Sequence, residues 1–171
     1  MYPCFKGCTA LESVTLSKKL SILPSGLFSG CTKLKSIEIP TSVTEVKAYA
    51  FEDCSSLTTI ELPKRVTQLG YFVFRGCSSL KTLIIRGNIE EVSSRNVNEQ
   101  RFGTIPEQVT IYCQPEQVET IQKYFSGTVL PLDMYQPDAE SVSAKEYTDP
   151  ATKVVYTYDT NGTTATVKAG Y

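Results

Sequence analysis

Residues 51–63 read Phe51-Glu52-Asp53-Cys54-Ser55-Ser56-Leu57-Thr58-Thr59-Ile60-Glu61-Leu62-Pro63. The cysteine of this segment belongs to a column of four cysteines that recur every 23 residues. A phenylalanine precedes each of these cysteines by three residues, and a leucine follows each by three. Such a fixed period indicates a repeat architecture. The three columns are Phe5, Phe28, Phe51 and Phe74; Cys8, Cys31, Cys54 and Cys77; and Leu11, Leu34, Leu57 and Leu80.

Four further apolar columns share the period, so that seven hold through four consecutive copies without a polar residue. One 23-residue copy cannot bury its apolar face alone, whereas stacked copies build a continuous core. The sequence therefore predicts a right-handed solenoid. The four columns are Val14, Ile37, Ile60 and Leu83; Leu16, Ile39, Leu62 and Ile85; Leu20, Val43, Val66 and Ile89; and Leu23, Val46, Leu69 and Val92.

Each copy divides into segments of different expected structure. The alternation around Ile60 and Leu62 predicts a strand with one buried face, and stacking these strands gives a parallel ladder. Pro63 ends the strand, because proline cannot donate a hydrogen bond to a sheet. The following Val-x-x-Leu spacing suits a second short extended or turn-like segment, and residues 47–51 could close the coil with a helical turn.

The Phe-x-x-Cys-x-x-Leu-x-x-Ile-x-Ile pattern resembles the BspA-like branch of the leucine-rich repeats, over roughly residues 4–125. The resemblance implies a leucine-rich-repeat solenoid of α/β to mainly β class. It also implies a large cell-surface or secreted protein of a host-associated bacterium or a parasitic protozoan, implicated in adhesion. The family supplies no catalytic residues that could be carried over to this chain.

Beyond the four regular copies the pattern departs from the repeat. Residues 93–100 lengthen the fourth coil, and Val109–Cys113 still predicts a strand. Glu116 to Phe125, after Pro115, predicts a capping helix. We expect a solenoid over residues 1–126, a linker over 127–150 and a β-hairpin over 151–171 around Asn161-Gly162. Both ends stop in mid-pattern, which indicates a segment of a longer protein.

Composition narrows the classes of function. The net charge of -1 gives little attraction to nucleic acids or anionic membranes. No apolar run approaches the ~20 residues that span a bilayer. The chain has no histidine, which excludes Ser-His-Asp and Cys-His catalysis and zinc sites that need imidazole. We expect a non-catalytic monomer or weak oligomer with no cofactor, no bound metal, no nucleic-acid partner and no direct membrane insertion.

The cysteine and phenylalanine columns predict core packing. Parallel strands ~4.7–4.9 Å apart bring adjacent cysteines into disulfide range, but parallel side chains leave their Cβ atoms too far apart for good geometry. A ladder of buried, reduced cysteines is therefore favoured, with disulfides and metal or redox chemistry as alternatives. Cys4 and Cys113 lie outside the column and are expected to be partly buried and inert, with pairing of one of them to a neighbour as the alternative. The phenylalanines predict stacked aromatic rings.

Candidate binding residues lie where the alternation points side chains to solvent. They form a Ser/Thr stripe beside an acidic patch, and we expect them to contact a protein or glycan ligand, with a host molecule as one candidate. The alternatives are a merely solvated β-face and a passive spacer within a long surface protein. A third column of Glu12, Lys35, Thr58 and Lys81 is typical of solubilising charge. The candidate residues are Ser13, Ser36, Thr59, Thr82, Thr15, Glu38, Glu61 and Ile84.

Two further sequence features, a pair of acids and a glycosylation sequon, do not require a functional site. Glu38 and Glu61 would stack at one strand spacing, but an open surface offers nothing to separate their pKa values for glycoside chemistry. Asn161-Gly162-Thr163 matches a glycosylation sequon, which the expected hairpin turn also explains.

The reduced ladder predicts the outcome of a thiol titration. In protein denatured without reductant, nearly all six cysteines should react with a thiol reagent. Finding two or fewer reactive thiols would instead require disulfides between neighbouring coils.

Overall fold

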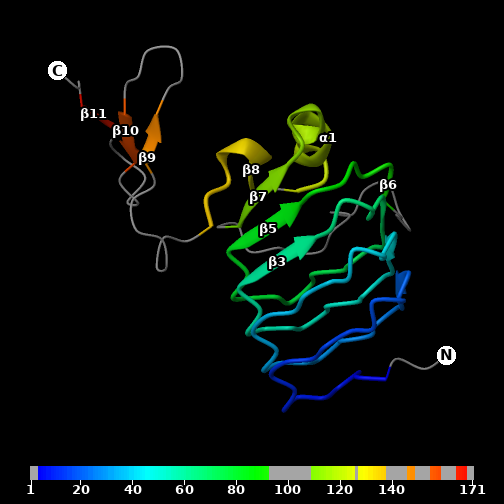
Figure 1. The fold of residues 1–171 in the computed structure, drawn as a ribbon. Coiled ribbons are helices and arrows are strands. Elements are labelled where there is room, and N and C mark those ends of the chain that lie inside the picture. Colours follow the sequence, from blue (N-terminus) through cyan, green and yellow to red (C-terminus); the bar gives the residue numbers. More distant parts are fainter. Residues whose placement is uncertain are drawn as a thin grey trace. The chain divides into compact units, whose positions relative to one another are not determined.

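The structure is a computed structural model that describes residues 4–92, 109–125, 127–137, 146–148, 155–158 and 165–168. The chain forms two compact units, Met1–Tyr135 and Gln136–Tyr171. The first unit is a stack of coils, shown in Figure 1 with its first coils in blue and its last in yellow-green. The predicted solenoid is therefore observed.

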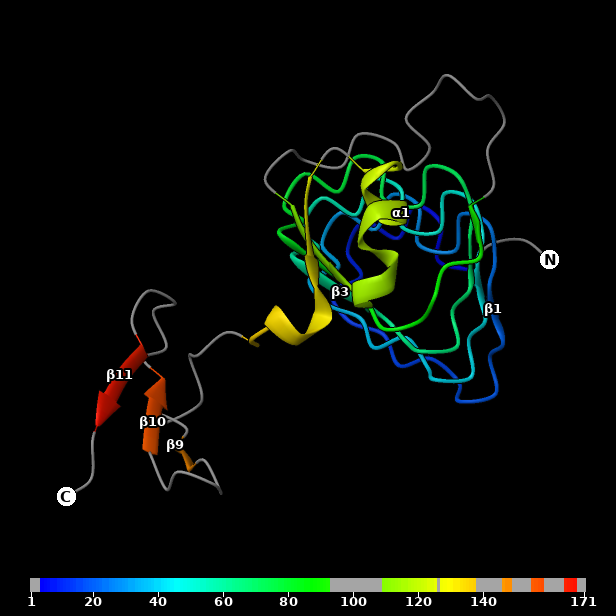
Figure 2. The same ribbon diagram turned by 90° about the horizontal axis from the view of Figure 1, so that it is seen from above.

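Two parallel sheets run along the stack. The first contains β3 (Thr59–Leu62), β5 (Thr82–Ile85), β7 (Thr110–Cys113) and β8 (Thr128–Pro131), in that order. The second contains the two-residue strands β1 (Ile22–Leu23), β2 (Glu45–Val46), β4 (Gln68–Leu69) and β6 (Glu91–Val92). Figure 2 views the overlaid coils from above, with β3 on one side of the ring and β1 on the other. The core lies between the two sheets.

The seven apolar columns form this core. From the second coil onward their members are buried, except Ile37 and Val92, which are partly buried. In the first coil the same columns are only partly buried, except that Leu23 is fully buried and Cys8 is exposed. The sequence thus predicts the interior correctly, coil by coil, from the second copy onward.

Two buried columns join each coil to the next. The rings of Phe28 and Phe51 stack with centroids 5.5 Å apart and planes 13° apart, as predicted. Their neighbours in the column stack in the same way, at 5.5 and 6.0 Å. The Cys54 thiol donates a hydrogen bond to the Phe28 carbonyl, with Sγ and O 3.2 Å apart, and the Cys31 and Cys77 thiols donate equivalent bonds at 3.1 Å.

Burial keeps the core cysteines protonated. It raises the pKa of the Cys54 thiol far above its ordinary value and that of Cys77 to about 12. Because the thiolate is the reactive form, these side chains are inert packing groups at neutral pH. Cys113 is fully buried, deeper than predicted, and burial raises its pKa to about 11. The prediction was wrong for Cys4, which is exposed.

The strand ladder is shorter than predicted. Residues 13–16 and 36–39 lie outside any assigned strand. A single backbone hydrogen bond, from Lys35 N–H to Glu12 O at 3.4 Å, joins these segments among the described residues. Ser13 and Ser36 stand where the later coils have the β-branched Thr59 and Thr82, which fit a strand better.

The predicted helical turn at residues 47–51 is wrong. Tyr49 has φ 60°, in the left-handed region, so the backbone cannot continue a right-handed helix here. Alternate N–H groups of this side bond the following coil, such as Phe51 N–H to Val73 O at 3.0 Å, while those of Ala50 and Glu52 close turns within their own coil. The chain therefore closes each coil with turns that are hydrogen-bonded between coils.

The C-terminal end of the solenoid extends beyond the predicted boundary. Pro115–Gln117 forms the 3-10 helix η1 and Val118–Gln122 the helix α1, shorter than the predicted helix but with Ile121 buried in the core. The chain then returns to the sheet as β8, paired with β7, and ends the unit with η2 (Leu132–Met134). Residues 127–135 thus belong to the solenoid unit, not to the predicted linker.

The second unit contains a three-stranded antiparallel sheet in the order β11–β10–β9. β10 (Val155–Tyr158) pairs with β11 (Ala165–Lys168), which are the two predicted hairpin strands. β9 (Glu146–Thr148) adds a strand where a linker was expected. The predicted turn and sequon at Asn161 and the insertion at residues 93–100 lie outside the described residues.

The left-handed turns predict an engineered stabilisation. Asp53 has φ 57°, whereas the equivalent positions hold Gly7, Gly30 and Gly76 with φ between 74° and 78°. Because an L-residue loses ~1–2 kcal/mol in this region, Asp53→Gly should raise the free energy of unfolding by about 0.5–1 kcal/mol after the loss of chain entropy. Urea unfolding measures the change.

The opposite change at the next coil is the control. A Cβ atom on Gly76 would overlap with Asp53 Oδ1, so Gly76→Ala should destabilise the protein. An Asp53→Gly variant no more stable than the parent would contradict the strain argument.

Candidate functional site

The outward face of the first sheet carries most of the predicted binding residues. In β3, Ile60 and Leu62 are buried, whereas Thr59 is half-buried and Glu61 is exposed. Thr82 is half-buried on β5, in register with Thr59. The predicted residues of the first two coils are all exposed on the continuation of this face: Ser13, Thr15, Ser36 and Glu38.

The hydroxyl stripe runs further than predicted. Thr82 is in register with Thr110 on β7, and Thr110 with Thr128 on β8. The two added threonines come after the irregular coil, where the 23-residue count no longer identifies them. The neighbouring column continues with Tyr112 and Leu130, so it changes from polar to apolar along the stack.

Ile84 is buried, so the prediction that its side chain points to solvent with the other candidate residues was wrong. Its exposed fraction is 1%, although it lies on the outward side of β5 between Glu61 and Tyr112. The segment η2 contacts β7, and the Tyr135 ring lies 5.0 Å from the Tyr112 ring, centroid to centroid. The end of the solenoid unit thus lies over the apolar part of this column.

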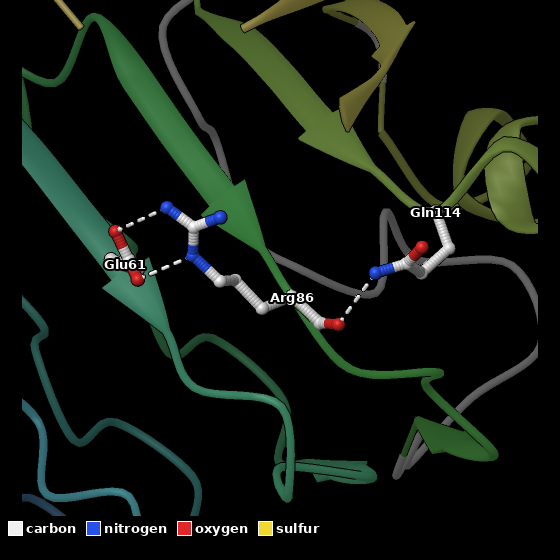
Figure 3. A network of polar contacts seen from close by, with 3 residues as sticks. All are labelled: Glu61, Arg86 and Gln114. Atoms are coloured by element: carbon white, nitrogen blue, oxygen red, sulfur yellow. Dashed lines mark hydrogen bonds and ion pairs between the residues drawn. The ribbon is translucent and has the colours of Figure 1, made fainter. Parts of the chain in front are cut away.

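Arg86, at the end of β5, binds Glu61, as Figure 3 shows. Its Nε donates to Oε1 of Glu61 at 2.5 Å and its Nη2 to Oε2 at 3.2 Å. This hydrogen-bonded carboxylate raises the pKa of the Arg86 guanidinium against the opposing effect of burial. The Gln114 amide in turn donates to the Arg86 carbonyl at 2.8 Å, which fixes the backbone at the end of β5.

The sequence contained a signal for this ion pair. Arg86 occupies the repeat position that Pro40 and Pro63 hold in the preceding coils. Arg86 follows the outward-facing Ile84 by two residues. Its long side chain can therefore extend over the outward face to an acid on the neighbouring strand. The pattern shows the substitution, but which acid the side chain contacts depends on the folded geometry.

Glu38 differs from Glu61 in this respect. It occupies the same column one coil earlier and is exposed, but Pro63 stands where an arginine would be needed. Among the described residues, Glu38 forms no ion pair. Its carboxylate therefore remains available to a cation from another molecule.

Two hollows flank Glu38. One of ≈ 320 Å³ lies between the first two coils, with Thr15 and Lys18 in its wall. The other, of ≈ 460 Å³, lies between the second and third coils, with Ser36, Glu61 and Pro63 in its wall. Glu38 and Thr41 line both. No described backbone hydrogen bond joins residues 36–39 to β3, so the larger hollow lies where the ladder is interrupted.

This geometry does not support the paired-acid chemistry considered for Glu38 and Glu61. Both carboxylates are exposed, and the Arg86 guanidinium already holds Glu61. A glycosidase needs one acid with a raised pKa in a protected site. Within the described ranges, no group of three His, Cys, Asp or Glu side chains could hold a metal, and no helix is long and apolar enough to cross a membrane.

A second side-chain cluster, which the sequence did not reveal, lies at the turns. Tyr49 and Phe72 have φ 60° and 55°, at the repeat position that Gly26 occupies one coil earlier, and their rings are 5.8 Å apart. The Arg75 guanidinium lies 5.2 Å from the Phe72 centroid and also pairs with Glu52. The charged groups of this cluster, Arg75 and Glu52, form an ion pair with each other, which indicates a role in packing between coils.

The chain belongs to the family described as BspA type leucine rich repeat region, whose model matches residues 2–128 in six copies. The family is generally non-catalytic and includes bacterial surface proteins. The family model thus counts two more copies than the four regular ones in the sequence. Comparison with curated proteins finds no match.

Solved structures show the same fold. The chain is 29% identical to the Treponema pallidum (T. pallidum) leucine rich repeat protein, covering 63% of this chain and 48% of that one, with a TM-score of 0.56. It is 21% identical to the pneumococcal vaccine antigen PcpA, covering 70% and 41%, with a TM-score of 0.51. The chain thus spans less than half the length of either structure.

The cover on Ile84 can be tested by removing it. Tyr135→Ala should destabilise the solenoid by about 1–2 kcal/mol, because it deletes the aromatic contact with Tyr112 and opens an apolar surface. Urea unfolding and the fluorescence of a hydrophobic dye on the native protein measure both effects. Met134→Ala, in the same segment but with Met134 59% exposed, is the control and should change little. Equal effects of the two variants would contradict the assignment.

Proposed function

We propose that this chain is a non-catalytic binding module of a cell-surface or secreted protein. Its binding face is the open part of the outward sheet surface, centred on Glu38. The observation that carries the proposal is the pair of hollows at an interruption of the strand ladder. Their walls combine hydroxyl groups, a carboxylate and apolar side chains, the mixture typical of recognition sites.

The surroundings of the hollows favour this part of the face over the rest. Toward the C-terminal end, the chain's own η2 and Tyr135 lie over the apolar column. Toward the N-terminal end, Ser13 and Thr15 are exposed, and Ser36 and Glu38 continue the open surface. A partner would thus contact the first three coils.

The surface or secreted location rests on the family, which includes bacterial surface proteins. A passive spacer is the second candidate, and the regular stack of coils favours it, because stacked repeats form a semi-rigid rod. The two candidates differ in whether the outward face recognises anything.

Binding to matrix separates them. The probe is immobilised extracellular matrix from cultured animal epithelial cells, with binding measured by biolayer interferometry. Ser36→Trp, which fills the larger hollow, should weaken binding at least tenfold. Gln68→Trp, on the exposed side of the second sheet, should leave it unchanged at equal thermal stability.

Treating the matrix identifies the partner class. Loss of binding after protease treatment indicates a protein, and loss after periodate oxidation indicates a glycan. No binding at protein concentrations up to about 100 μM, or equal binding by Ser36→Trp and the parent, would support the spacer.

A further inference from the structure

We infer that the Glu38 hollow takes an arginine side chain of a protein partner. This inference rests on the proposed binding function and names the chemistry of the partner. Its precedent lies one coil further along the same column, where Arg86 binds both oxygens of Glu61. The fold therefore already presents a carboxylate from this column to a guanidinium in a two-point geometry.

The two glutamates differ in what the chain supplies to them. Glu61 receives Arg86 from the turn that ends the following strand, whereas the equivalent position for Glu38 is Pro63. Proline carries no charge and no side-chain donor. Glutamate thus occupies the same position in two successive coils. Glu61 is paired with an arginine of this chain, whereas Glu38 has no ion pair among the described residues.

The larger hollow fits the rest of an arginine side chain. Ile39 and Pro63 in its wall offer apolar surface to the aliphatic stem, while Ser36 and Thr41 offer acceptor oxygens to the remaining N–H groups. Its ≈ 460 Å³ exceeds the ~300 Å³ at which ligand pockets begin. Lys18 lines only the smaller hollow, so the entering cation has no lysine in the wall of the larger one.

Arginine fits better than lysine or a sugar. A planar guanidinium engages both carboxylate oxygens at once, whereas an ammonium group acts as a point charge. A neutral glycan could donate hydroxyl hydrogen bonds to Glu38, but it carries no positive charge to pair with the carboxylate. The ion pair between Glu38 and an incoming arginine would be exposed to water, which weakens it. A single arginine should therefore bind with a dissociation constant in the millimolar range (~4 kcal/mol at 1 mM).

The test titrates three capped pentapeptides into the full chain, with NMR shifts as the readout. They are Gly-Gly-X-Gly-Gly peptides with arginine, lysine or the neutral isostere citrulline at X. The arginine peptide should produce saturable amide shifts at residues 36–41, the lysine peptide weaker ones and the citrulline peptide none. Raising the salt concentration should weaken the arginine response, because the pair is exposed.

Variants locate the site. Glu38→Gln should weaken binding of the arginine peptide at least fivefold, while Glu119→Gln, an exposed acid on α1, should not change it. Arg86→Ala leaves Glu61 without its cation and should add a second set of shifts around Glu61. Shifts that persist in Glu38→Gln, equal responses to arginine and citrulline, or no second site in Arg86→Ala would overturn the inference.

The outcomes remain separable from those of the matrix experiment. If Ser36→Trp abolishes matrix binding but Glu38→Gln does not, the binding function stands and the arginine site is wrong. Binding lost only after periodate treatment also leaves the binding function standing and overturns the arginine site. If both variants bind matrix like the parent while the peptide shifts appear, the arginine site exists but does not serve the matrix partner.

Discussion

The hydrogen bond that Cys31, Cys54 and Cys77 each donate to the phenylalanine carbonyl of the preceding coil is the constraint on which the rest depends. Because Cys54 Sγ lies 3.2 Å from Phe28 O while the two phenylalanine rings stack, neither column tolerates a shift between coils. Burial raises the pKa values of these thiols and so preserves them as donors. A stack locked in this way also fixes the register of every outward column.

That register explains why the outward face changes character along its length. The column that begins with Thr15 and Glu38 ends with Tyr112 and Leu130, since the core imposes nothing on outward residues. Its apolar end would be exposed on a bare solenoid, and η2 with Tyr135 lies over it. The open end retains hollows and a carboxylate, which places recognition among the first three coils in our proposal.

The period could predict the core because burial within a repeat depends on neighbours one coil away, which carry the same pattern. It could not predict the burial of Ile84, since the Tyr135 that lies over this column belongs to a segment outside the repeat. Gly7, Gly30 and Gly76 recur at the position of the left-handed turns, which is a sequence signal for a positive φ there. Asp53 interrupts this column, so the signal is incomplete in the sequence. The repeat pattern therefore cannot predict the burial of a residue that packs against a segment outside the repeats.

The single position that ends each strand decides whether the glutamate of the preceding coil is paired with a cation. Arg86 replaces a proline at the end of β5 and satisfies Glu61 across the neighbouring strand, whereas Pro63 leaves Glu38 open. The exchange does not disturb the core, because the Arg86 carbonyl is held by Gln114 and Gly87 follows it in the turn. A repeat protein can thus open or close an acidic site at a chosen coil by changing the single residue that ends the following strand.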